Sequence, residues 1–176
     1  PGIYGRVASD PTVSRLIKLL ACDADRAIAA IKRARQTARR TAWGLAGDAS
    51  PAARATVADP LIIDLDATLV TAHSDKEQAA ATFKRGFGFH PLCAFVDHGP
   101  QGTGEPLSIL LRPGNAGSNT AADHQTVIAD ALDQAGMGSR PGRRVLIRID
   151  GAGATKATLE TLTRRRVSYS VGFTLP

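Results

Sequence analysis

The chain has 176 residues, of which 43% are hydrophobic and 22% are charged. This length allows one sizeable hydrophobic core, and the composition is typical of a soluble globular protein. No apolar run approaches the ~20 residues of a membrane-spanning helix and no signal peptide is visible, so we expect a cytoplasmic protein without membrane contact.

Basic residues are concentrated in the first third of the chain. Residues 1–60 carry ten Lys or Arg against five Asp, whereas residues 61–176 carry twelve against eleven acids. The formal charge of +6 and the pI near 9.9 favour a polyanionic partner such as nucleic acid. The two cysteines and four histidines lack zinc-type spacing, and we assign them no chemistry.

Two helices are predicted first. Asp10 followed by Pro11 is a helix-start signal. After a break near residues 22–25, the run RAIAAIKRARQTARRTAWGLAG is rich in helix formers and ends on Gly44 and Gly47. At 100° per residue its apolar side chains form one stripe, with most Arg and Lys off it. The basic face is either simply solvated or a contact surface for nucleic-acid phosphates.

A linker composition marks the expected domain boundary. Residues 48–60, DASPAARATVADP, have the Pro, Ala, Asp and Ser bias of a linker. We therefore expect a basic helical DNA-binding segment with its linker at residues 1–59. A second domain should occupy residues 60–176.

The core is predicted as three strands, helix, strand, helix, strand. The strand segments are LIIDLDATLV (61–70), GFGFHPLCAFVDH (86–98), EPLSILLRPG (105–114), RRVLIRID (143–150) and SYSVGFTL (168–175). One helix, capped by Asn119 and Thr120, should end near Ala135, and the other is TKATLETLTRRR. The first three strands suggest an antiparallel meander, and right-handed crossovers would lay the last two parallel to the first. The fold class is therefore α/β, with a mixed sheet.

Two acids in the first of these strands need an explanation. With the two-residue period of a strand, Asp64 and Asp66 lie opposite an entirely apolar face. Buried carboxylates require a partner or a metal ion, although an exposed edge strand would also satisfy them. Asp150 ends a strand that is expected beside this one, where ligands collect in such sheets. The acids could then converge on Mg²⁺ or Mn²⁺, unless Asp150 is only a turn residue before Gly151.

Five segments, in order, resemble the DDE-type transposases of bacterial insertion sequences, of the group 1 DDE domain type. The likeness spans residues 10–176 and implies a ribonuclease-H-like core. It maps the first catalytic acid onto Asp66, in Asp66-Ala67-Thr68, and the second onto Asp150; Asp64 is a neighbour that could also hold metal. The matching segments are IDLDATLV, KRGFGFHPL, LLRPGNAGSNTAADH, RVLIRIDGAG and SYSVGFTLP.

The resemblance implies metal-dependent DNA strand cleavage and transfer with two Mg²⁺ or Mn²⁺ ions. The expected partners are double-stranded DNA, namely the terminal inverted repeats and the target, and a second copy in a synaptic complex. The DNA-bound protein would be associated with the nucleoid. The third acid, a Glu, is expected on a helix beyond residue 176, and Glu160 is read as a helix-surface acid. The isolated chain, truncated before that Glu, is not expected to catalyse at a normal rate.

Several basic side chains are candidates for contacting DNA phosphates, although exposed Lys and Arg also serve solubility. The candidates are Arg33, Arg39, Arg40, Lys84, Arg85 and Arg112.

Two other functions stay open on the sequence. LIIDLDATLV also resembles the first motif of haloacid-dehalogenase-type phosphatases, with Asp64 as nucleophile and Asp66 as general acid. That family has a sheet that is parallel throughout. The other alternative is an inert DNA-binding remnant of a transposase.

Overall fold

The computed structural model describes residues 7–100, 102, 104–117 and 120–173. The chain divides into two compact units, Pro1–Ala38 and Arg39–Pro176. The division between the units, after Ala38, falls within a helix and differs from the domain boundary expected after residue 59. That boundary stays a prediction of where the catalytic core begins. In the described ranges, no helix combines the length and the apolar character needed to cross a membrane.

The first unit is helical, as its sequence predicts. Helix α1 (Asp10–Ala21) follows the N-cap Ser9, with Pro11 in its first turn. The expected break lies at Cys22 and Asp23, where the Asp23 carboxylate accepts from the Arg26 N–H at 3.2 Å. Helix α2 (Ala24–Ala46) then runs into the second unit and ends before Gly47, whose φ of +52° favours glycine.

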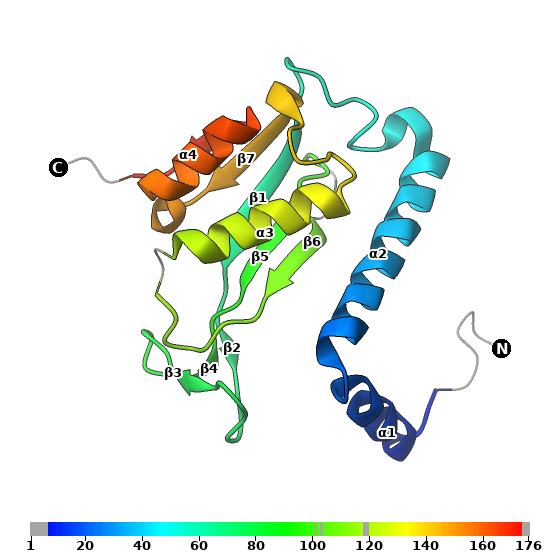
Figure 1. Ribbon diagram of the computed structural model, residues 1–176, viewed down its shortest axis with the longest axis vertical. Helices are drawn as coiled ribbons and strands as arrows, with labels where there is room; N and C mark the ends of the chain where they lie inside the picture. Colours follow the sequence, from blue (N-terminus) through cyan, green and yellow to red (C-terminus); the bar gives the residue numbers. More distant parts are fainter. Residues whose placement is uncertain (1–6, 101, 103, 118–119, 174–176) are drawn as a thin grey trace. The chain divides into compact units, whose positions relative to one another are not determined.

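The second unit contains a five-stranded mixed sheet in the order β6-β5-β1-β7-β8. Strands β5 and β6 form the predicted antiparallel meander with β1, and β7 and β8 run parallel to β1 as expected. Helices α3 and α4 pack against each other, α3 on β5 and β6 and α4 on β8 (Figure 1). The bounds are β1 Leu61–Ala67, β5 Leu92–Val96, β6 Glu105–Leu110, α3 Ala121–Gln134, β7 Val145–Ile149, α4 Lys156–Arg165 and β8 Ser168–Val171.

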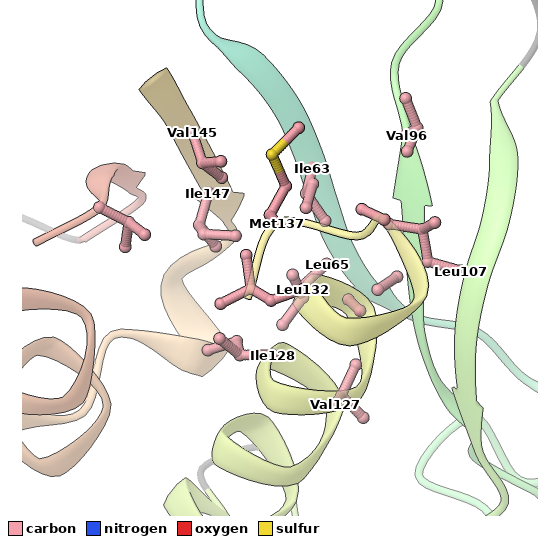
Figure 2. Close-up of a cluster of buried hydrophobic side chains, with 14 of the residues drawn as sticks. Ile63, Leu65, Val96, Leu107, Val127, Ile128, Leu132, Met137, Val145 and Ile147 are labelled. Carbon is pink, nitrogen blue, oxygen red and sulfur yellow. The ribbon is translucent and has the colours of Figure 1, made fainter. Parts of the chain in front are cut away.

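The core lies between this sheet and its helices. The apolar face predicted for β1 is buried, with Ile63 fully inaccessible, and Ile147 of β7 lies beside Ile63 in the register. Figure 2 shows these side chains meeting Ile128 and Leu132 of α3. Each such buried side chain contributes about 1.5–3 kcal/mol relative to exposure. This packing fixes which face of β1 is turned away from the helices.

One predicted strand is divided between two sheets. The segment 86–98 forms β4 (Phe87–Phe89) in a small sheet of order β2-β4-β3, and then β5 in the main sheet. The partners of β4 are the short strands β2 (Val70–Thr71) and β3 (Ala80–Ala81). Pro91, which has no N–H to donate to a ladder, lies at the division. At Gly88 a Cβ would lie 2.0 Å from the Val70 carbonyl oxygen, so the close approach of β2 and β4 requires glycine.

The part of α2 in the second unit is held by a buried arginine. Arg39 is 7% exposed, and its Nε donates to Glu105 Oε1 of β6. Its Nη2 donates to the Pro106 carbonyl at 2.9 Å, and its Nη1 donates to Gln134 of α3. The Trp43 indole N–H, one turn later, donates to Glu105 Oε2 at 3.2 Å. The guanidinium group of Arg39, which was expected to contact DNA, therefore binds carboxylate and carbonyl oxygens inside the fold.

We expect the stability of the chain to fall in acid through Glu105. Burial alone would raise the pKa of Glu105, but the hydrogen bond and charge of Arg39, with help from His98 and Trp43, lower it below its ordinary 4.5. A carboxyl whose pKa is lower in the folded state adds stability above its unfolded pKa and loses it as the pH falls through the folded pKa. Glu105→Gln should therefore flatten the loss of thermal stability between about pH 5 and pH 3. An equally steep loss in the variant would contradict this role.

Candidate active site

Two aspartates meet at one end of the main sheet. Leu65 of β1 pairs with Ile149 of the parallel strand β7, and each is followed by an acid, Asp66 and Asp150. Neighbouring strands lie about 4.8 Å apart, so both acids reach the same edge of the sheet. Both line one pocket of about 480 Å³, which is within the size range of ligand sites. The structure thus brings together the two acids that the sequence predicts to converge.

Local turns orient both carboxylates. Asp66 Oδ1 accepts from the N–H of Ala67 at 2.8 Å. Asp150 Oδ1 accepts from the N–H of Ala152 at 3.1 Å and caps the short turn Gly151–Gly153. These bonds use one oxygen of each carboxylate and restrict its rotation. Among the residues that the structure describes, no hydrogen bond uses either Oδ2 atom, and oxygen donors of this kind suit Mg²⁺ and Mn²⁺.

A buried arginine and two histidines form another part of the pocket wall. Arg112 is 4% exposed and donates from Nε to the His90 carbonyl at 2.9 Å. Its Nη1 donates to Gly117, Thr120 and Asp123 at 3.2–3.3 Å. Arg112 therefore fastens the loop before α3 to the segment that precedes β5.

His124 faces the pocket from the first turn of α3 and is 2% exposed. Its Nδ1 lies 2.9 Å from the Thr120 carbonyl oxygen, which can only accept, so Nδ1 carries the proton. A Cβ on Gly153 would lie 2.8 Å from His124 Nε2 and 2.2 Å from Ile149 Cγ2. Glycine at 153 is thus required for the turn after Asp150 to approach α3.

The charge of Asp66 affects a cysteine on the neighbouring strand β5. Cys93 of β5 lies opposite Asp66 in the register and is buried. Burial raises the pKa of the Cys93 thiol, the negative charge of Asp66 raises it further, and Arg112 acts in the opposite direction. Asp66 and Arg112, which both line the pocket, therefore act on the neighbouring strand β5 in opposite directions.

Asp64 has a different environment from Asp66. Its two oxygens accept from Arg148 Nε and Nη2, at 2.5 and 2.6 Å, and Arg148 Nη2 also donates to Asp97 at 2.8 Å. These hydrogen bonds, first of all the one to Asp64, raise the pKa of Arg148. Asp64 does not line the pocket of Asp66 and Asp150. The geometry therefore does not support the expected contribution of Asp64 to a metal site.

The phosphatase interpretation of Asp64 finds no support either. As a nucleophile, Asp64 would need a free carboxylate oxygen, whereas both of its oxygens are paired with Arg148. Strand β1 also pairs antiparallel with β5, unlike the fully parallel sheet of that family.

The six basic candidates for DNA contact fall into two groups. Arg39 and Arg112 are buried and donate to carbonyl and carboxylate oxygens of the fold, which corrects the expectation that their guanidinium groups face phosphates. The other four are exposed, in α2 and in the turn between β3 and β4: Arg33, Arg40, Lys84 and Arg85.

Sequence reasoning missed several residues of the pocket wall. Phe83, His90 and His124 line it, although no role was expected for them. Two segments that carry the resemblance to transposases contribute residues to this wall, namely KRGFGFHPL and LLRPGNAGSNTAADH. This resemblance was the sequence feature that could have pointed to the missed residues.

Across the described ranges, no three His, Cys, Asp or Glu side chains are grouped closely enough to hold a metal ion. Glu160 is a surface acid, as expected, 3.9 Å from Lys156.

Comparison with protein families matches residues 3–175 to the transposase DDE domain, group 1. No curated protein matches the chain.

Proposed function

Because the chain belongs to the group 1 family of transposase DDE domains, we propose that it is the part of a transposase that cleaves and transfers DNA strands at the ends of an insertion sequence. The observation that carries this proposal is the shared pocket of Asp66 and Asp150, at adjacent parallel strand ends. The order of three antiparallel strands followed by two parallel crossovers supports a ribonuclease-H-like core.

The donor set of the pocket fits divalent metal. Asp66 and Asp150 would hold Mg²⁺ or Mn²⁺ through carboxylate oxygens, and the third carboxylate implied by the resemblance would complete a site for two ions. Bound ions would supply the positive charge that neutralises the scissile phosphate and activates a water or a DNA 3′-hydroxyl. The chain itself contributes preorganisation: the turn N–H groups of Ala67 and Ala152 fix the two acids, and Arg112 fixes the loop before α3, which also lines the pocket.

Exposed basic side chains would hold the DNA. Arg33 and Arg40 of α2, with Lys84 and Arg85, are available to phosphates, whereas the buried arginines are not. Each phosphate contact releases counterions, so duplex binding should weaken steeply as salt rises. Binding of terminal repeats and target DNA, and pairing of two copies in a synaptic complex, belong to the same proposal.

Calorimetric titration with Mn²⁺ tests the metal site. The wild-type chain should bind Mn²⁺ at least about tenfold more tightly than an Asp66→Ala, Asp150→Ala variant, because both lost groups are charged ligands. Asp64→Asn is the matched control: it removes a charge from the same strand outside the pocket and should leave Mn²⁺ affinity unchanged. Equal binding by the wild type and the double variant would show that these two acids are not a metal site.

A further inference from the structure

The turn at Thr82–Gly86, which joins β3 to β4, lies beside the pocket and is held by three hydrogen bonds. The Thr82 N–H donates to the Gly86 carbonyl at 2.9 Å, and the Arg85 N–H donates to the Thr82 carbonyl at 3.0 Å. The Gly86 N–H donates to Thr82 Oγ1 at 3.0 Å. The turn therefore presents its side chains from a fixed backbone.

Phe83 in this turn is an exposed aromatic ring in the wall of the candidate active-site pocket. The residue is 70% exposed, although it lines the same pocket as Asp66 and Asp150. Its ring lies 5.5 Å from the ring of His90, tilted by 54°, and His90 is itself buried. Phe83 is thus supported from within the fold while most of its surface stays open to a ligand.

One lysine ammonium group lies over the ring. Lys84 Nζ lies 5.7 Å from the centre of the Phe83 ring, and Arg85 follows it. A ligand that fits this arrangement has a flat apolar face and carries negative charge beside it. A nucleotide has both features: its base stacks on aromatic rings and its phosphate pairs with Lys and Arg.

Stacking on Phe83 further requires that the base of the nucleotide is unpaired. Bases inside a duplex are covered on both faces by their neighbours, so a protein ring can stack only on an unpaired or extruded base. We propose that Phe83 is the stacking platform for one unpaired base next to the phosphate held at Asp66 and Asp150, with Lys84 and Arg85 on the flanking backbone. This inference rests on the proposed function, because it takes the pocket acids as the site of strand cleavage.

The test measures DNA binding without cleavage. Asp66→Asn and Asp150→Asn are introduced throughout, which removes both the reaction and the repulsion of phosphate. Two probes are compared, a fully paired duplex and the same duplex with a short single-stranded flank containing 2-aminopurine at the junction. Phe83→Ala should weaken binding of the flanked duplex by about tenfold, from the loss of one base–ring stack, and relieve the quenching of 2-aminopurine. Binding of the paired duplex should change less than about twofold.

Two further variants separate stacking from general damage. Phe83→Trp keeps a flat ring and should restore tight binding and quenching, whereas Phe173→Ala removes an equally exposed ring that does not line the pocket and should change neither. Equal loss of affinity on both probes, or unchanged quenching in Phe83→Ala, would overturn the inference. If Phe83 instead inserted as a wedge between paired bases, Phe83→Ala would weaken binding of the paired and the flanked duplex equally. Cleavage is measured separately on protein that has Asp66 and Asp150 intact and extends to the Glu that the resemblance implies, so failure of the proposed function is distinguishable from failure of the stacking.

Discussion

Replacing Asp66 or Asp150 with asparagine is expected to lower metal-dependent DNA nicking by about a thousandfold or more, equivalent to about 4 kcal/mol of transition-state stabilisation. Asparagine keeps the size of the side chain but removes the charge that a divalent cation requires. The measurement is the conversion of supercoiled plasmid to nicked circles with Mn²⁺, by protein extended past residue 176 to include the Glu that the resemblance implies. Because the two acids line one pocket, the double variant should be about as inactive as either single variant.

The chain offers matched controls for this experiment. Asp64→Asn removes a carboxylate two residues away whose partner is Arg148, and Glu160→Gln removes a surface acid on α4. Both should nick DNA at the wild-type rate. Retained nicking in Asp66→Asn and Asp150→Asn would contradict the assigned site. Salt-sensitive binding of duplex DNA by the wild type with no nicking at all would instead favour the inert remnant.

Arg39→Ala is expected to lower the free energy of unfolding by about 3–5 kcal/mol, because it leaves Glu105 and two backbone carbonyls without their charged donor. Arg39→Lys should recover only part of this loss, since a single ammonium cannot reproduce the planar fork. Equilibrium unfolding in urea, monitored by circular dichroism, gives the comparison.

The neighbouring residue provides the control for Arg39. Arg40 is exposed, and Arg40→Ala should change the free energy of unfolding by less than about 0.5 kcal/mol. Duplex affinity should show the opposite order: Arg40→Ala weakens it, while Arg39→Ala, measured where it is still folded, does not. If Arg39→Ala were as stable as the wild type and bound DNA poorly, Arg39 would be a DNA contact after all.

Features governed by local periodicity could be predicted from the sequence. Alternation in residues 61–66 gave the buried face of β1, and the strand and helix order gave the parallel placement of β7 and β8. Because parallel strands end at the same edge of a sheet, these two facts were enough to bring Asp66 and Asp150 together. The long segment 86–98 was assigned to one strand because propensity does not reveal which sheet a residue joins.

The sequence by itself thus determined the α/β order, the core face of β1 and the pair of acids, because all three follow from spacing along the chain. Only the tertiary structure decided which charged side chains are buried and paired and which are exposed. Arg39 meets Glu105 across 66 positions and Arg148 meets Asp64 across 84, and no local pattern encodes such pairs. A charged side chain is buried when a distant strand presents a partner for it, which is why Arg39 is buried against Glu105 while Arg40, next to it in sequence, is exposed.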